Sequence, residues 1–295
     1  MTPTTTPSDS APADLSALTG PAETAEAAFM HAYEADAPAE VRAALGITTA
    51  RIGGGVALAM RKDPIGFWTR ALGFGISEPV TAELLDEIVE FYRASGVASA
   101  VVQIAPSLLP PDWDEISAAR GIEPGSPGAL WVKLGAAIED LHPKASTELR
   151  VGPVEPSDAE EWAAAILRGY GAPLDDIALM LAAGVRHPDF RPYAAWDGDE
   201  IVAGASLLLH GSVASLNTAA TVPGHRGKGA QTALIAARVE AARREGCRWV
   251  TAETGLPAEG QRNPSLDNLE SAGLHRLYLR PNWIWRATDA DGTGR

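Results

Sequence analysis

The sequence predicts an α/β (α+β) protein of two tandem lobes, each a mixed, mostly antiparallel sheet flanked by helices. Three observations support this fold class. Residues 76–107 align with residues 226–257 at a constant offset of 150. Both copies have the same order of helix, strand, helix and tryptophan-bearing strand. A run of three strands precedes the helix of the second copy.

The repeat is visible in the letters. The first copy reads TAELLDEIVEFYRASG and then VASAVVQIA, and the second reads QTALIAARVEAARREG and then CRWVTAETG. Gly96 and Gly246 end the two helices, as glycine commonly does. Farther on, ISAARGI aligns with LESAGLH, and the strands LWVKL and NWIWR follow. A duplication explains this shared order better than a chance likeness between two helix–strand units.

The boundaries follow from composition. Residues 1–24 are rich in Thr, Pro, Ser and Ala, and we expect a flexible tail there. A helical region ending at Gly46 opens the first lobe, 25–140, and the polar segment DLHPKASTE links it to the second lobe, 148–286. We expect residues 287–295 to fray.

The elements of the second lobe have clear signals. ELRVGPV reads as a strand, and DAEEWAAAILRGYG reads as a helix with acids in its first turn and a glycine stop. Residues 191–222 read as three strands, with turns at Asp197-Gly198 and at His210-Gly211-Ser212. Such short turns predict an antiparallel meander.

Composition excludes several classes of protein. The chain has 295 residues and a formal charge of −14, which argues against a nucleic-acid or anionic-membrane surface as partner. The one cysteine, Cys247, forms no internal disulfide, and we find neither a secretory signal nor a membrane span, so we expect a cytoplasmic protein. The histidines and the cysteine have no metal-ligand spacing, so we expect no metal.

The loop after the meander carries the strongest chemical signal. TVPGHRGKGAQT, residues 221–232, places three glycines between a strand and a helix. Glycines let backbone N–H groups point toward one place, and a helix N-terminus adds unpaired N–H groups and a positive dipole end. With Arg226 and Lys228, this loop predicts a site for a phosphate or diphosphate. The dinucleotide-binding and Walker spacings both fit it poorly.

The spacing that fits is Arg226-Gly-Lys-Gly229-Ala-Gln231, and here the chain resembles the GNAT superfamily of N-acyltransferases. Gln231 departs from the small residue usual at the last motif position. The resemblance implies two tandem GNAT-like lobes and an acyl-CoA site, with acetyl-CoA or another acyl-CoA as co-substrate. The loop residues it implies for the cofactor are Thr221, Val222, Pro223, Arg226, Gly227, Lys228, Gly229, Ala230, Gln231 and Thr232.

The resemblance continues downstream. VTAET, residues 250–254, looks like the strand that separates from the preceding one (about 214–222) and leaves a gap for the pantetheine arm. NPSLDNLESAGLHRLYLRPNW resembles the next segment of the family. Asn263, Ser265 and Asn268 near its helix start are candidate cofactor contacts, and helix capping explains Asn263 and Ser265 about equally well.

The first lobe lacks this loop. ISEPVT stands where the second lobe has RGKGAQ, so Pro79 replaces Gly229 and Glu78 replaces Lys228. Proline removes a donor and glutamate repels phosphate. We therefore expect one acyl-CoA site per chain, with a degenerate first lobe that shapes the acceptor pocket or takes the place of a dimer partner. A monomer and a homodimer both remain open.

The acid and base are less clear. The glutamate that many family members carry on the strand before the loop is missing, and Leu269 stands where a tyrosine is often found. Our candidates are Glu253 as base through water, Tyr278 as acid and His225 as a further base. A backbone N–H near Ala220–Val222 is the expected oxyanion donor.

The resemblance thus implies an acyl-CoA-dependent N-acyltransferase, with acetyl as the expected acyl group. It would act on the amine of a small soluble molecule by direct attack on the thioester. One alternative takes its acyl group from a carrier protein. Another is a non-catalytic acyl-CoA-binding sensor, which the missing acid and base make plausible.

Overall fold

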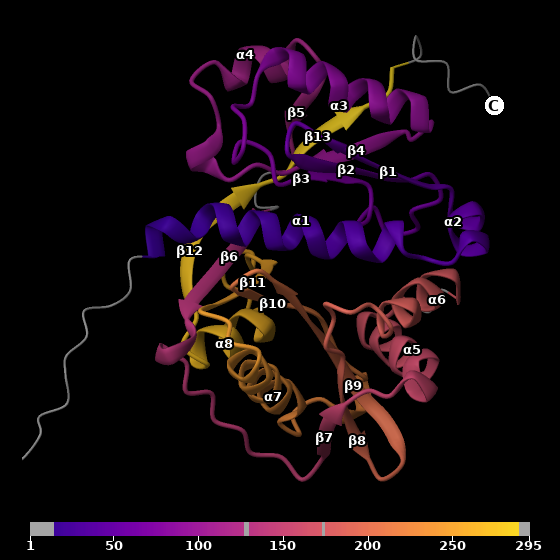
Figure 1. Cartoon of the computed structure of the whole chain (residues 1–295), viewed down its shortest axis with the longest axis vertical. Helices are drawn as coiled ribbons and strands as arrows, with labels where there is room; N and C mark the ends of the chain where they lie inside the picture. The colour runs from indigo at the N-terminus through magenta and orange to yellow at the C-terminus, as the bar shows by residue number, and fades with distance from the viewer. Residues whose placement is uncertain (1–14, 127–129, 173–174, 289–295) are drawn as a thin grey trace, which may run out of the picture.

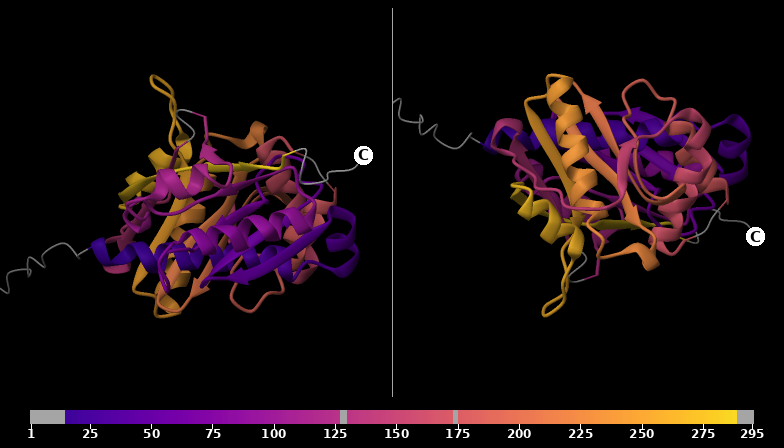
Figure 2. Two further views of the ribbon diagram at one scale, coloured as in Figure 1. Left: turned by 90° about the horizontal axis from the view of Figure 1, so that it is seen from above. Right: turned by 90° about the horizontal axis from the view of Figure 1, so that it is seen from below.

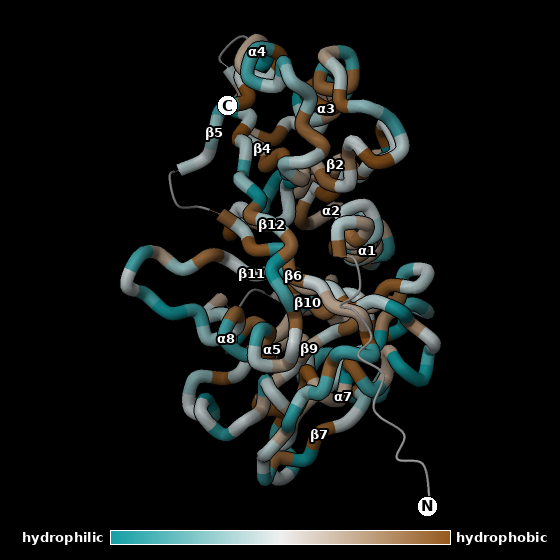
Figure 3. The backbone as a smooth tube through the Cα atoms, turned by 90° about the vertical axis from the view of Figure 1, so that its left-hand side faces the viewer, coloured by the Kyte–Doolittle hydropathy of each residue, from teal (hydrophilic) through white to brown (hydrophobic). Residues whose placement is uncertain are grey.

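The chain folds into two stacked sheets with one long helix between them. The computed structural model describes residues 15–126, 130–172 and 175–288. Helix α1, Thr19–Ala35, lies at the junction and packs on both β1 of the first sheet and β10 of the second. Figure 3 shows the same stacking from the side, with α1 seen nearly end on where the two lobes meet.

The first sheet has the strand order β1-β2-β3-β4-β13-β5. Its neighbours pair antiparallel, except β3 and β4, which run parallel. The strands are Ile47–Ile52, Gly55–Met60, Arg70–Leu72, Ser99–Val102, Trp283–Arg286 and Ile122–Pro124 in that order.

The second sheet has the order β12-β6-β11-β10-β9-β8-β7. Here β10 and β11 run parallel and the other neighbours antiparallel. The strands are His275–Pro281, Leu130–Ala137, Trp249–Gly255, Val213–Thr221, Glu200–His210, Tyr193–Asp197 and Arg150–Pro153 in that order. The predicted meander is confirmed as β8, β9 and β10.

The helices cover both sheets. Seen from below, α7 lies across one face of the second sheet, opposite the face that α1 covers (Figure 2). Besides α1, the α-helices are α2 Ala39–Leu45, α3 Ala82–Ser95, α4 Trp113–Ala118, α5 Ala159–Tyr170, α6 Asp175–Gly184, α7 Ala230–Arg244 and α8 Pro264–Ser271. Single 3-10 turns are Leu15–Leu18, Pro106–Leu108, Ile138–Asp140, Pro156–Asp158 and Pro223–His225.

Local signals explain why the repeated helices form. The Thr81 side chain accepts a hydrogen bond from the N–H of Leu84 and caps α3. Gly96 ends α3 with a φ of 66°, and Gly246 follows α7 with a φ of 75°, conformations that favour glycine. The predicted fold class, two mostly antiparallel mixed sheets flanked by helices, is therefore confirmed.

The two sheets exchange one strand each. Strand β6 leaves the first half of the chain and pairs between β11 and β12, while β13 returns from the C-terminal end and pairs between β4 and β5. These are the two tryptophan-bearing strands of the repeat. The sheets thus differ from the continuous lobes 25–140 and 148–286 expected from the sequence, because each sheet is completed by the other half.

The tail expected over residues 1–24 is wrong for residues 15–24, which form a 3-10 turn and the start of α1. Helix α1 begins at Thr19, and Leu18, Ala22 and Glu23 are buried. Glu23 is buried because it pairs with Arg280, a residue 257 positions away that composition does not reveal. Residues 1–14 of that expected tail and 289–295 of the expected frayed end lie outside the described residues.

In the part of the chain that the structure describes, no helix combines the length and the apolar character needed to cross a membrane.

Candidate active site

The two parallel strands of the second sheet separate halfway along. Residues Val213–Leu216 of β10 pair with Trp249–Ala252 of β11, and the pairing stops there. A bulge between Asn217 and Ala220 turns β10 aside, and Thr218 has a φ of 49°. β11 instead continues along β6 to Gly255. This gap lies where the resemblance predicted it.

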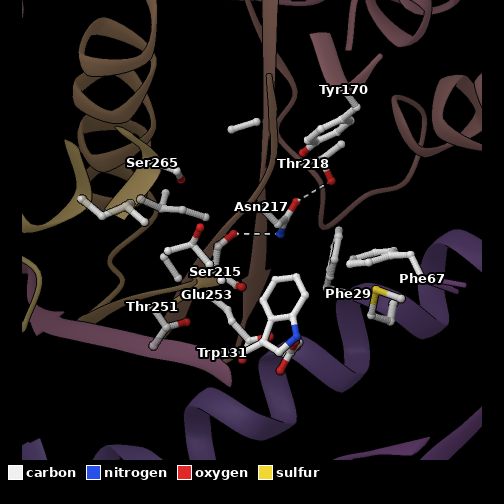
Figure 4. Close-up of a pocket in the computed structure, with 18 of the residues that line it drawn as sticks. Phe29, Phe67, Trp131, Tyr170, Ser215, Asn217, Thr218, Thr251, Glu253 and Ser265 are labelled. Atoms are coloured by element: carbon white, nitrogen blue, oxygen red, sulfur yellow. Dashed lines mark hydrogen bonds between the residues drawn. The ribbon is translucent and has the colours of Figure 1, made fainter. Parts of the chain in front are cut away.

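A cavity of about 670 Å³ occupies the gap. Gln231 of α7 and Asn268 of α8 line it on one face of the sheet, and Glu26 of α1 and Tyr170 of α5 line it on the other. Figure 4 shows Trp131 with Phe67 on one side of it and Ser215 and Glu253 on the other, while Asn217 and Tyr170 lie above. The cavity therefore passes through the sheet and joins its two faces.

The glycine-rich loop leaves a set of donors free. Gly227 and Gly229 have φ values of 81° and 77°, which turns the chain sharply into α7. Within the described residues, the backbone N–H groups from Gly227 to Thr232 donate to no protein acceptor. An exposed cluster of unpaired N–H groups at a helix N-terminus is suited to an anion.

The linker between the halves holds this loop in place. The Thr147 hydroxyl donates to the carbonyl of Lys228 at 2.6 Å. A Cβ at Gly229 would lie 2.2 Å from the carbonyl oxygen of Ser146. Gly229 is therefore needed both for its positive φ and for the close passage of the linker.

The polar side chains of the loop make contacts within the protein. Arg226 donates to the carbonyls of Gly169 and Thr221, at 2.8 and 3.3 Å. Lys228 lies 2.8 Å from Asp197, and Gln231 donates to the Thr221 hydroxyl at 3.1 Å. The backbone, and not these side chains, supplies the free donors.

The remaining candidate residues for the cofactor lie in two places, some in the loop and some at the start of α8. The N–H of Val222 donates to Val202, and Pro223 begins a 3-10 turn, so both shape the loop. Asn263 caps α8 through the N–H of Ser265 and donates to Gly255. Ser265 and Asn268 also line the cavity on the α8 side.

A buried cation next to the bulge was not among the residues predicted from the sequence. Arg238 of α7 is 1% exposed, and its guanidinium donates to the carbonyls of Ser206 and Asn217. It thereby joins the two strands at the residue pair that directly precedes the bulge. Burial lowers the pKa of Arg238 to about 10, so the group stays charged at neutral pH. The signal in the sequence that could have identified Arg238 was a basic residue on the otherwise apolar face of α7.

The bulge also bears on the expected oxyanion donor. Val222 donates to Val202, and Ala220 and Thr221 pair with β9. Thr218 and Ala219 are the residues that the register shift leaves without a β9 partner. Because the Val222 N–H donates to Val202, the alternation along the strand turns the Thr221 N–H away from β9 and toward the gap, so it stays within the expected range; the unpaired Thr218 is a second candidate.

A cluster of buried ionised side chains closes the other end of the cavity. Lys133 of β6 and Arg280 of β12 lie between three carboxylates, those of Glu23, Glu26 and Glu253. Arg280 contacts all three at 2.5 to 2.6 Å, and Lys133 contacts Glu26 at 2.5 Å and Glu253 at 3.1 Å. Both carboxylates that line the cavity, Glu26 and Glu253, make these contacts through Oε2.

The second oxygens of these two carboxylates remain available. In the described chain, Oε1 of Glu26 and Oε1 of Glu253 accept no hydrogen bond. The side chains are 13% and 10% exposed, and both line the cavity. Two carboxylate oxygens therefore face the space next to the gap.

The two carboxylates differ in acidity. Burial raises the pKa of Glu253 despite the nearby Arg280 and Lys133. Burial acts in the same direction on Glu26, but Arg280 and Lys133 outweigh it and hold the pKa of Glu26 well below its usual range. Glu253 is thus the better proton acceptor of the pair.

The three candidate catalytic residues lie in different places. Glu253 lines the cavity, as described above. The Tyr278 hydroxyl donates to Glu23 at 2.6 Å, and burial together with Glu23 raises the pKa of Tyr278, so it is poorly placed to give up a proton at the gap. His225 lies 3.5 Å from Asp197 at the outer loop. Neither Tyr278 nor His225 lines the cavity.

The matching place in the first lobe is filled. Gln103 stands at the position of Glu253, and Arg70 donates to it at 3.0 Å. Gln103 in turn donates to Asn282 at 2.8 Å. A Cβ at Gly54 would lie 1.7 Å from the Ser77 hydroxyl, so the β1–β2 turn packs closely on the loop before α3.

Comparison with known proteins agrees with this geometry. Residues 157–262 match the Acetyltransferase (GNAT) family. A GCN5-related N-acetyltransferase from Kribbella flavida superposes with a TM-score of 0.58 at 18% identity, covering 90% of this chain and 96% of that one. A tandem GNAT protein from the clavulanic acid biosynthesis pathway superposes with a TM-score of 0.55 at 16% identity, covering 94% and 96%. No curated protein matched the sequence.

The strand separation, the loop and the sequence match define the second lobe as a GNAT domain. Residues 157–262 therefore match the Acetyltransferase (GNAT) family, and the fold of the chain is similar to that of a tandem GNAT protein.

Proposed function

We propose that this protein transfers an acyl group, with acetyl the expected one, from acyl-CoA to the amine of a small molecule. The observation that carries the proposal is the cavity through the sheet, with free N–H donors near one opening and free carboxylate oxygens at the other. A donor and an acceptor can thus meet from opposite faces, an arrangement suited to direct transfer.

The loop is the proposed seat of the diphosphate. The N–H groups from Gly227 to Thr232 and the dipole of α7 would hold its oxygens, with Lys228 nearby. Ser265 and Asn268 of α8 would line the pantetheine arm. The side chain of Arg226 is proposed to hold the loop and not the phosphate, because both of its contacts are to carbonyls.

Glu253 is the proposed base. An ammonium group next to Glu253 Oε1 would give up one proton, and the free amine would attack the thioester carbonyl. As the C–N bond forms and the C–S bond breaks, the second proton leaves nitrogen and the thiolate gains a proton. The N–H of Thr221 or one near Thr218 is the proposed partner of the carbonyl oxygen.

The cofactor site is tested by Gln231→Glu. The change is isosteric and puts a carboxylate beside the free N–H groups, where a helix N-terminus tolerates it. Because the new charge repels a diphosphate, we expect acetyl-CoA to bind at least tenfold more weakly, with unchanged thermal stability. Calorimetric titration measures the affinity.

The matched control is Glu83→Gln in the first turn of α3, the same region of the first lobe. We expect no change in acetyl-CoA affinity for it. Equal affinities for wild type and Gln231→Glu would contradict the proposed site. Thiol release on addition of amines separates a transferase from a sensor, which would bind acetyl-CoA without releasing thiol.

A further inference from the structure

We propose that the acceptor is a primary ammonium carried by a short spacer on a flat uncharged ring. The ammonium binds between Glu26 and Glu253, and the ring lies beside Trp131 above Gly255. This inference deepens the proposed function and rests on it.

The position proposed for the ammonium group follows from two carboxylate oxygens that accept no hydrogen bond. Oε1 of Glu26 and Oε1 of Glu253 face the cavity without a hydrogen bond from the described chain, while their Oε2 atoms are held by Lys133 and Arg280. Two negatively charged oxygens held in place bind best to a positively charged group that has several hydrogen-bond donors. A primary ammonium has three N–H donors and meets both requirements.

The position proposed for the ring follows from the register between strands β6 and β11. Trp131 of β6 stands directly opposite Gly255 of β11, as Lys133 stands opposite Glu253. Gly255 carries no side chain, and a Cβ built there meets nothing within 4 Å. A space therefore lies next to the Trp131 ring, on the sheet face that carries Glu253. The Phe67 ring lies 6.3 Å from Trp131, centroid to centroid, and forms a second aromatic wall.

Strand geometry sets the spacer. Trp131 and Lys133 are two residues apart on one face of β6, which corresponds to about 6 to 7 Å. Since Lys133 holds both carboxylates, the ammonium nitrogen and the ring centre are separated by a similar distance. A spacer of two or three carbons spans it.

Charge excludes a carboxylate next to the amine. The free atoms at the ammonium end are carboxylate oxygens, and the two cations beside them already contact Glu23, Glu26 and Glu253. An amino acid would bring its own carboxylate against like charge. Arg70, whose guanidinium lies 4.2 Å from the Phe67 ring centroid, disfavours a cationic ring, and the aromatic faces of Phe67 and Trp131 favour an apolar one.

The test compares three amines with acetyl-CoA. 2-Phenylethylamine carries ammonium, spacer and ring; ethanolamine lacks the ring; phenylalanine adds a carboxylate. We expect kcat/KM for 2-phenylethylamine to exceed both others at least tenfold. Gly255→Val fills the space beside Trp131 at a position that is not left-handed. Gly255→Val should lower kcat/KM for 2-phenylethylamine at least tenfold. It should change kcat/KM for ethanolamine less than threefold, and the affinity for acetyl-CoA less than threefold.

Trp131→Ala should act in the same way as Gly255→Val. Its matched control is Trp283→Ala, the equivalent position in β13, which packs on Trp113 in the first lobe. We expect Trp283→Ala to leave the ratio between the three amines unchanged. Ethanolamine or phenylalanine as the better substrate, or a ratio insensitive to Gly255→Val, would overturn the inference.

A binding measurement separates this inference from the proposed function. 2-Phenylethylamine is titrated into the protein with and without CoA. Binding that Gly255→Val abolishes, in the absence of any thiol release, would support the amine site while the transferase proposal fails. Thiol release with other amines, together with no binding of 2-phenylethylamine, would support the transferase proposal and contradict the proposed amine site.

Discussion

Glu253 shows how one residue can be held firmly and still keep a free oxygen. Arg280 and Lys133 contact its Oε2, and Oε1 faces the cavity. Gln103 occupies the equivalent place in the first lobe and also lies near Arg280, at 3.4 Å. A glutamine is therefore compatible with this surrounding, which makes Glu253→Gln a suitable test.

We expect Glu253→Gln to lower kcat/KM about 10²- to 10⁴-fold at neutral pH, because the amine loses its proton acceptor. The deficit should shrink as the pH rises toward the pKa of the amine, where solvent delivers the free amine. Wild-type activity should fall at low pH as Glu253 gains a proton, and burial, which raises the pKa of Glu253, moves that fall to higher pH. A constant deficit across the pH–rate profile would remove Glu253 from the mechanism.

Glu34 presents a different case, because neither carboxylate oxygen has a partner in the described chain. The residue is 0% exposed, and the nearby Tyr92 hydroxyl is also unpaired. Burial raises the pKa of Glu34 well above its usual value. Glu34 therefore keeps its proton to a higher pH in the folded protein than in the unfolded chain, where the ordinary pKa is 4.5.

This difference should lower the free energy of unfolding as the pH rises above 4.5, until the folded-state pKa is passed. Glu34→Gln removes the titration. We expect the variant's stability relative to wild type to increase between pH 5 and pH 7, measured by urea unfolding at both values. Parallel stability curves for the two proteins would contradict the assignment.

At the scale of elements, the carboxylates of α1 hold this helix to the second sheet. Glu23 accepts from Arg280 and from Tyr278, both at 2.6 Å, and is 1% exposed. Removing one member of a buried ion pair leaves the other charge uncompensated. The sequence indicated none of this, because the partners of Glu23 lie on β12 in the other half of the chain.

We therefore expect Glu23→Ala to lower the free energy of unfolding by about 3 to 5 kcal/mol. Chemical denaturation measures it. Glu40→Ala on α2 is the control, since Glu40 is exposed, and it should stay within about 0.5 kcal/mol of wild type. A small effect at Glu23 would mean that α1 is not held by this cluster.

At the scale of the molecule, the exchange of β6 and β13 makes the two halves interdependent. Without β13, β4 and β5 have no common partner, and without β6, β12 is separated from β11. Lys133, which holds Glu253, also reaches the second sheet only through β6. The first half of the chain thus contributes Lys133 to the candidate site of the other half.

We expect residues 1–144 and 145–295, produced separately, to remain unfolded or to aggregate, and to recover structure when refolded together. The intact chain should unfold in one calorimetric transition, because both sheets lose a strand at once. Two separate transitions, or a folded isolated half, would contradict this.

The sequence alone determined the features whose signals are local. The Thr81 cap and a glycine stop fix α3, and glycines bound α7. The period of apolar residues fixes the repeat, and the glycine-rich loop identifies the GNAT domain. The candidate base Glu253 could also be found, because it is the one carboxylate in β11.

Only the tertiary structure decided which half completes which sheet. Two similar tryptophan-bearing strands carry no signal for their partners, since strand pairing depends on residues far away in the chain. For the same reason the cluster of Glu23, Glu26, Lys133, Glu253 and Arg280 could not be predicted. Its members come from α1, β6, β11 and β12, and the energy of bringing them together depends on the folded surroundings and not on local sequence.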